Sequence, residues 1–302
     1  METQPPVSCF CLTYGRPRLL EEAIHSFLLQ DYAGPKEMIV LNDYADQVLS
    51  FDHPEVHVIN LPKRFRTLGE KLNAAVALAS HDLLFVWDDD DIYLPHRLSF
   101  SVASFAPSKG FFKAASTWVW CNGSLSGPAQ NRFHAASCWS RALFDAIGGY
   151  AADGSGTDAI FERQLAARFP GATAPFVVTP EEIYYVYRWG GTGSYHLSGF
   201  GIAKPGQNFG YAKVAARVER QAHRGEIPLG RVVLQPHWKH DYPRLIADHL
   251  AAQRTADART KGGTSQGQDK TFPEDAVSMD RIKETIDVKS TENQGRLHRS
   301  GG

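Results

Sequence analysis

Four consecutive aspartates, Asp88, Asp89, Asp90 and Asp91, lie between apolar segments in the stretch FVWDDDDIYLP. Carboxylates this close together repel one another, and the repulsion costs free energy unless a cation or a set of hydrogen-bond donors compensates it. Carboxylate oxygens are hard ligands of the kind that Mg²⁺ and Mn²⁺ prefer. The stretch therefore predicts a divalent metal site. The alternative is an acidic turn that caps the following helix, a role that one or two of the four can fill.

The elements that must position these aspartates alternate between strands and helices. Short apolar runs that end in polar residues predict strands at 7–12, 38–41, 56–59 and 83–87. Apolar residues at helical spacing predict helices that begin near Pro17 and Leu68. This order is typical of an α/β fold with a mainly parallel sheet, in which ligands bind beyond the carboxyl ends of the strands. We therefore expect Thr13, Asp43 and Asp88 to converge on one site.

The second half of the chain has a less regular pattern. It predicts helices at about 97–105, 140–147 and 158–169, strands at 113–120 and 183–187, and a turn at 122–128. Glycines crowd residues 190–206, which favours a loop that can act as a lid. Weak helical spacing returns at 211–223 and 244–253, and the chain from about 255 onward is too polar to cover a core of its own.

We expect one catalytic domain over residues 1–205, with a nucleotide-binding half to about residue 110 and an acceptor half from 111. A helical extension at 206–254 and a polar, disordered tail at 255–302 should follow.

Composition excludes several classes of protein. The chain has 32 basic and 33 acidic residues and a formal net charge of -1, so no overall field attracts nucleic acid or anionic lipid. The four cysteines lack a CxxC spacing and are predicted to be reduced core thiols. No apolar run approaches the roughly 18 to 20 residues of a membrane span, and residues 1–6 are polar. We therefore expect a cytoplasmic protein with no transmembrane segment.

Further short motifs follow the same order as the predicted elements. The first strand runs into Thr13, Tyr14, Gly15 and Arg16, and the second ends in Asn42 and Asp43. The aspartates are followed first by an apolar pair and then by Pro95 and Leu98. A Gly-Gly-Tyr segment at 148–150 precedes Thr157 and Asp158. In order and spacing, the chain resembles a family 2 glycosyltransferase of the GT-A fold over roughly residues 7–201.

The resemblance implies a GT-A type, Rossmann-like sandwich with a mainly parallel central sheet flanked by helices. In three places the chain departs from the pattern of this family. Gly15 replaces the usual Asn, Asn42 replaces the first Asp of a pair, and Thr157 replaces the Glu of a Glu-Asp pair. Asp43 is therefore the carboxylate left on the second strand, and Asp158 is the carboxylate left of the Glu-Asp pair.

The resemblance also implies a role for most of these residues. Asp90 would hold the metal, with Asp88 or Asp91 assisting, while Asp88 and Asp89 would face the donor and Asp89 would orient its sugar. Asp43 would contact the base or ribose, and Thr13, Tyr14 and Arg16 would line the nucleotide pocket. His196, in a glycine-rich segment, would complete the metal shell or contact the diphosphate.

Three residues have a catalytic or phosphate-binding interpretation beside a structural one. Arg66 and Lys71 can pair with phosphate charge, or they can lie on a solvated helix face. Asp158 is the candidate general base for the acceptor hydroxyl. Its alternative role is to cap the helix that follows, although Thr157 can cap while Asp158 catalyses.

Together these features predict a metal-dependent, inverting glycosyltransferase of the hexosyltransferase type that uses Mn²⁺ or Mg²⁺. The expected donor is a nucleoside-diphosphate sugar, with UDP as the expected nucleotide, and the acceptor is left open among glycan, lipid-linked sugar, protein and modified nucleic acid. A sugar nucleotidyltransferase is one alternative, but it should carry a glycine-rich, basic loop where this chain has TYGRPR. A non-catalytic module that binds nucleotide sugars is the other, because Asn42 and Thr157 depart from the family pattern.

Overall fold

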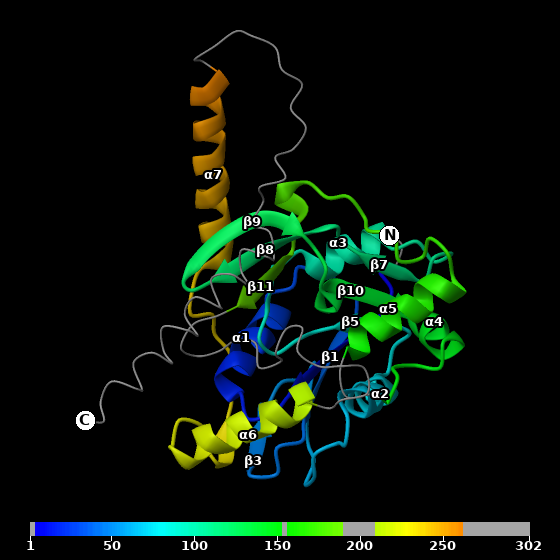
Figure 1. Cartoon of the computed structure of the whole chain (residues 1–302), viewed down its shortest axis with the longest axis vertical. Helices are drawn as coiled ribbons and strands as arrows, with labels where there is room; N and C mark the ends of the chain where they lie inside the picture. The colour runs from blue at the N-terminus through cyan, green and yellow to red at the C-terminus, as the bar shows by residue number, and fades with distance from the viewer. Residues whose placement is uncertain (1–3, 153–155, 190–208, 262–302) are drawn as a thin grey trace, which may run out of the picture. The chain divides into compact units, whose positions relative to one another are not determined.

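The computed structural model describes residues 4–152, 156–189 and 209–261 (Figure 1). By its internal contacts the chain divides into two units, residues 1–250 and 251–302. Every strand of the described residues lies in the first unit. The expected domain boundaries at 205 and 254 stay predictions.

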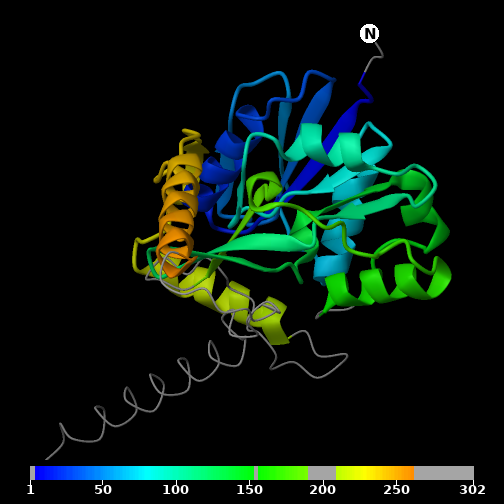
Figure 2. The same cartoon turned by 90° about the horizontal axis from the view of Figure 1, so that it is seen from above.

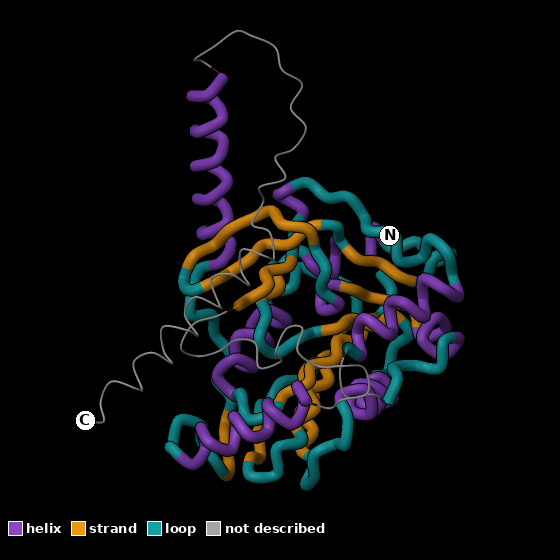
Figure 3. The backbone as a smooth tube through the Cα atoms, viewed as in Figure 1, coloured by secondary structure: helices purple, strands orange, loops and turns teal. Residues whose placement is uncertain are grey.

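The first unit is built on a six-stranded central sheet in the order β4-β2-β1-β5-β10-β7. Figure 3 shows the strands in orange between purple helices. Its parallel part consists of β1 (Val7–Thr13), β2 (Lys36–Asn42), β4 (Val56–Asn60) and β5 (Leu83–Val86). Strand β10 (Ser137–Ser140) runs antiparallel to β5 and to the edge strand β7 (Phe111–Lys113). The predicted α/β class, with a mainly parallel central sheet flanked by helices, is confirmed.

Successive side chains of a strand point to opposite faces of the sheet, so each face packs against its own hydrophobic core. Cys9 and Cys11 of β1 belong to the core that includes α1 (Pro17–Leu28) and α3 (Arg97–Ser104). Phe10 points to the other face, into the core with α2 (Leu68–Leu78), α4 (Arg141–Ala146) and α5 (Thr157–Arg168). In Figure 2, α3 and α5 accordingly lie on opposite sides of the strands. All four cysteines are free, which confirms that they form no disulfide.

A second sheet, in the order β6-β11-β8-β9, packs on the α1 side of the first. Its strands are β6 (Ile92–Tyr93), β11 (Tyr185–Trp189), β8 (Ser116–Cys121) and β9 (Ser124–Gln130). The predicted strand at 113–120 is wrong, because β7 and β8 divide it between the two sheets. The predicted turn at 122–128 is also wrong in extent. Pro128 suggested a turn, but β9 is an edge strand, where a residue without a backbone N–H is tolerated.

The C-terminal elements of the first unit pack onto the same framework. Strand β12 (Gly230–Val233) pairs in parallel with β3 (Gln47–Ser50), and both α6 (Phe209–His223) and the start of α7 (Tyr242–Lys261) belong to hydrophobic clusters. Two short 3₁₀ helices, His134–Ala136 and Pro180–Glu182, complete the elements of the described residues. Among these residues, no helix has the length and apolar character needed to cross a membrane.

Candidate active site

The polar ends of three parallel strands come together through two basic side chains. Lys71 of α2 donates a hydrogen bond to the Thr13 carbonyl oxygen at 2.6 Å and forms a buried ion pair with Asp43. Arg16, after β1, forms ion pairs with Asp89 and, at 2.8 Å, with Asp90. The carboxyl ends of β1, β2 and β5 therefore meet at one edge of the sheet, as the sequence predicted.

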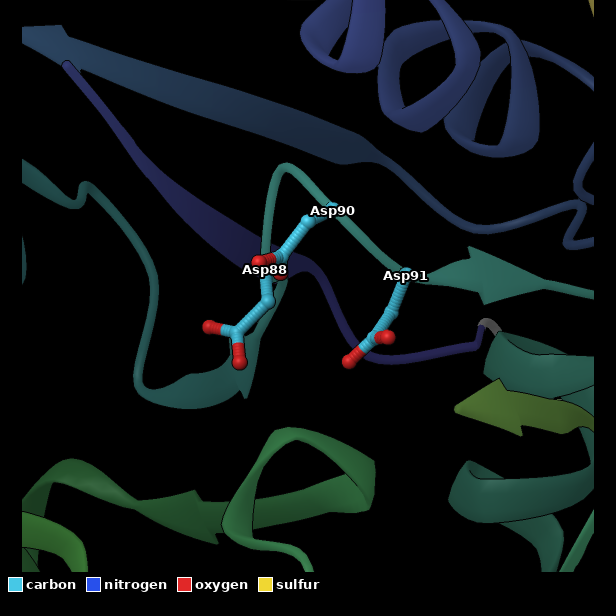
Figure 4. A group of neighbouring side chains, drawn as sticks. All are labelled: Asp88, Asp90 and Asp91. Carbon is cyan, nitrogen blue, oxygen red and sulfur yellow. The ribbon is translucent and has the colours of Figure 1, made fainter. Parts of the chain in front are cut away.

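The turn between β5 and β6 carries the four aspartates, and three of them converge (Figure 4). Asp88, Asp90 and Asp91 each offer a carboxylate oxygen, and these oxygens lie within 4.8 Å of one another. The side chains of Asp88 and Asp91 extend to the same side of the turn, while that of Asp90 runs toward Asp88. Asp89 is not one of these three, and its carboxylate pairs with Arg16, which also pairs with Asp90. Three hard oxygen donors at this spacing fit a divalent cation such as Mg²⁺ or Mn²⁺.

Electrostatics support the same interpretation. Burial raises the pKa of Asp91 to about 8, and the charge of Asp90 adds to this effect. Loss of solvation also raises the pKa of Asp88 well above its usual value, together with the charges of Asp90, Asp91 and Asp158. Burial raises the pKa of Asp89 to about 6 even though Arg16 lowers it. A bound cation would relieve this repulsion, since it favours the ionised form of every carboxylate around it.

The aspartate turn is held in place by groups from the second sheet. The Tyr185 hydroxyl donates to one oxygen of Asp91 at 2.6 Å, and the backbone N–H of Arg188 donates to the other at 2.9 Å. The Arg188 side chain also donates through Nε to the Asp90 carbonyl oxygen at 2.6 Å. Strand β11 thus fixes both the backbone of the turn and the orientation of the Asp91 carboxylate.

Arg188 is itself held by a fully buried ion pair with Glu22 of α1, at 2.7 Å. The Glu22 carboxylate also accepts hydrogen bonds from the Lys239 backbone N–H at 3.2 Å and the Tyr242 hydroxyl at 3.2 Å. The sequence patterns did not predict this ion pair. The available signal was a glutamate inside the apolar face of the predicted helix and an arginine inside the run YYVYRW, because buried charges are almost always paired.

The two basic residues predicted to pair with phosphate lie in different environments. Lys71 is buried, and burial lowers its pKa despite the opposing effect of Asp43. Arg66 is exposed at the start of α2 and pairs with Glu70 one helical turn away. The structure thus brings Lys71 into the site with Thr13 and Asp43, whereas the phosphate-binding role of Arg66 stays a prediction.

Asp158 lies in the first turn of α5 and is exposed. The N-cap position is Gly156, in a left-handed conformation, so the prediction that Thr157 or Asp158 caps this helix is wrong. The negative charge of Asp158 is one of the causes that raise the pKa of Asp88 and of Tyr150. His196, predicted to complete the metal shell, lies outside the described residues.

Comparison with known proteins identifies the family of this chain. The sequence profile of glycosyl transferase family 2 matches residues 8–167, more than half of the chain. The chain belongs to this family, and the resemblance drawn from its motifs is confirmed.

One curated relative is the "Putative colanic acid biosynthesis glycosyl transferase WcaA" of Escherichia coli (strain K12), 30% identical over 153 residues. This match covers 48% of the present chain and 54% of WcaA, so the chain spans about half the length of that relative.

Similar solved structures include S. aureus TarS 1-349 in complex with UDP-GlcNAc, with a TM-score of 0.45, 18% identity, and coverage of 63% of this chain and 60% of that one. Another is the mannosyltransferase PcManGT from Pyrobaculum calidifontis in complex with GDP-Man and Mn²⁺. Its TM-score is 0.46 at 16% identity, with coverage of 85% of this chain and 81% of that one.

Proposed function

We propose that this protein is a metal-dependent, inverting glycosyltransferase that moves a sugar from a nucleoside-diphosphate donor, with a UDP-sugar as the expected donor, to an acceptor hydroxyl. The observation that carries this proposal is the convergence of Asp88, Asp90 and Asp91 at the carboxyl end of β5 in a family 2 chain. The acceptor stays open among glycan, lipid-linked sugar, protein and modified nucleic acid.

The donor half of the site is the edge formed by the ends of β1, β2 and β5. Asp43 and the loop from Thr13 to Arg16 would bind the nucleoside. Lys71 supports this part of the site, since it joins Thr13 to Asp43. Arg16 holds Asp89 on the nucleotide side of the turn, where Asp89 would orient the donor sugar.

The leaving group is a nucleoside diphosphate, on which negative charge builds as the bond to the anomeric carbon breaks. Asp90, with Asp88 and Asp91, would hold Mn²⁺ or Mg²⁺, which when bound supplies Lewis-acid stabilisation of that charge. Tyr185 and Arg188 hold the Asp91 carboxylate in a fixed orientation before any substrate arrives. Such preorganisation removes the cost of reorienting ligands during the reaction.

The acceptor half needs a base that takes the proton of the attacking hydroxyl. Asp158 would fill this role, because its carboxylate is exposed to solvent and its charge influences Asp88 of the aspartate turn. A base in this position removes the proton while the acceptor oxygen attacks the face of the sugar opposite the leaving group, so the anomeric configuration inverts.

A binding experiment tests the proposal before the acceptor is known. The unfolding temperature of the wild-type chain should rise with one nucleoside diphosphate or its sugar conjugate in the presence of Mn²⁺, because a ligand that binds only the folded state stabilises it by about 2.7 kcal/mol at 100 times its Kd. The Asp90→Ala protein should lose the shift, and the control Asp82→Asn, which changes a highly exposed carboxylate, should keep it.

Two results would contradict the proposal. The first is the absence of a Mn²⁺-dependent shift with UDP, GDP, CMP, TDP and their common sugar conjugates. The second is nucleotide binding without donor hydrolysis or transfer across a broad set of acceptors, which would instead support a module that binds the sugar nucleotide without turnover.

A further inference from the structure

Beside the aspartate turn, two tyrosine rings from distant parts of the chain enclose one arginine. The guanidinium carbon of Arg64 lies 4.2 Å from the ring centre of Tyr14, on the loop after β1, and 3.6 Å from that of Tyr211, on α6. The same guanidinium donates a hydrogen bond to the Tyr211 carbonyl oxygen at 2.8 Å. The two rings therefore form a slot that holds one flat, delocalised group.

The slot opens on the carboxylate at the end of β2. The Tyr211 hydroxyl lies 3.4 Å from the Asp43 carboxylate, as donor to its Oδ2, and the Tyr44 ring packs 4.9 Å from that of Tyr14. Because Lys71 joins Asp43 to Thr13, the slot and the aspartate turn belong to the same sheet edge. A nucleotide whose diphosphate is held at the turn would place its base on this side.

Helix α6 is seated on the loop that carries Tyr14 through a contact that only glycine permits. Gly15 has a φ of +67°, and a Cβ at this position would lie 2.3 Å from Cγ1 of Val218, a fully buried residue of α6. At that distance the two atoms would overlap, so the Val218 side chain or the backbone around it would have to shift. The replacement of the usual Asn by Gly15 thus accompanies the close packing that brings Tyr211 over Tyr14.

We propose that Tyr14 and Tyr211 form an aromatic clamp for the base of the donor nucleotide, and that the Arg64 guanidinium occupies the place of that base and is displaced when the nucleotide binds. This inference rests on the proposed function, and it adds α6 to the donor site. A nucleobase matches the slot because it is flat and stacks on aromatic rings through its π-face.

Arg64 is suited to leave the slot. The side chain is only partly buried, and its Nε has no hydrogen-bond partner among the described residues. Cation–π contacts of a partly exposed arginine are weak compared with the stacking of a base between two rings. Solvent can hydrate the released guanidinium, so exchange removes one unmet hydrogen bond and creates a larger stacked surface.

The test uses substitutions with opposite expected signs. Titration calorimetry of the full chain with UDP and GDP, each with Mn²⁺, measures nucleotide affinity, and pyrophosphate with Mn²⁺ is the probe that lacks a base. Tyr211→Ala should weaken nucleotide binding roughly ten-fold, whereas Arg64→Ala should strengthen it roughly three-fold because the competing occupant is gone. Neither should change the affinity for pyrophosphate.

Two further variants separate stacking from folding. Tyr211→Phe keeps the ring and should retain most of the nucleotide affinity that Tyr211→Ala loses. Arg220→Ala, an exposed position on the same helix, is the matched control and should behave as wild type.

The outcomes distinguish this inference from the function on which it rests. If neither nucleotide binds the wild-type chain, both the proposed donor and the clamp are wrong. If nucleotide binds the wild-type chain and Tyr211→Ala equally well, only the clamp is wrong. If Arg64→Ala loses affinity in parallel with Tyr211→Ala, Arg64 is part of the binding surface and the exchange is overturned.

Discussion

Two carboxylate-bearing regions of this molecule, the aspartate turn and the start of α5, are built in opposite ways. In the aspartate turn, Asp91 is fully buried and each of its carboxylate oxygens accepts a hydrogen bond. Arg188, which pairs with Glu22, also donates a hydrogen bond to the backbone of the turn. At the start of α5, Asp158 is exposed and follows a glycine in a left-handed conformation. A buried, hydrogen-bonded carboxylate and an exposed one can be disrupted separately, so substitutions can test the proposed donor role of the first and the proposed base role of the second.

The largest effect that separates the regions should come from Asp158→Asn. Loss of a general base typically lowers turnover about 10²- to 10⁴-fold, and we expect a loss in this range from a transfer assay with the identified donor and acceptor. The affinity for donor and the unfolding midpoint should both match wild type, because the residue is exposed. Near-normal turnover would remove Asp158 from the reaction.

Arg188→Met should act on stability instead. It leaves Glu22 charged and buried without its main partner, which typically costs about 3–5 kcal/mol. Urea unfolding should show a decrease of this size. The double variant Glu22→Leu with Arg188→Met should recover part of the loss, because both charges are then absent.

If the loss of unfolding free energy in the double variant equals the sum of the losses in the two single variants, the two side chains are not coupled. Arg244→Met is a matched control, because Arg244 is exposed and pairs at 3.8 Å with the exposed Asp248. We expect little change in its unfolding midpoint, since exposed pairs contribute little.

A smaller effect should follow from Tyr185→Phe, which removes only the hydroxyl that orients Asp91. Loss of a hydrogen bond to a metal-ligating carboxylate lowers metal affinity about 10-fold or more. Titration with Mn²⁺ alone, followed by electron paramagnetic resonance, measures this change. Tyr184→Phe is the matched control because its hydroxyl donates to the Ala136 carbonyl oxygen. Equal Mn²⁺ affinity in both variants would separate Asp91 from metal binding.

The smallest effect concerns pH. Burial raises the pKa of Glu22, but Arg188 and Lys239 outweigh burial, so its folded pKa lies below the usual 4.5. A lowered pKa stabilises the fold above the unfolded value, and this contribution is lost as pH falls through the folded value. The difference in unfolding free energy between wild type and Glu22→Gln should therefore narrow below about pH 4.5. A difference that stays constant down to pH 3.5 would contradict the assignment.

Local patterns predicted much of the fold near the site. Apolar runs with polar ends located β1, β2, β4 and β5, and helical spacing located α1 and α2. The same reasoning failed at β8, because periodicity along one segment does not say which sheet the segment joins, and at β9, because Pro128 suggested a turn. It also left unresolved which of the four aspartates converge, since adjacent side chains point in directions that the turn and its partners decide.

By itself, the sequence determined the α/β class, the order of the motifs and the placement of carboxylates at strand ends, because these features depend on periods of two and 3.6 residues and on short spacings. Only the tertiary structure decided the partners of the charged groups. Glu22 and Arg188 are 166 residues apart, and Tyr211 meets Asp43 across 168. Such contacts depend on which faces pack together, and a local pattern of residue types does not specify this.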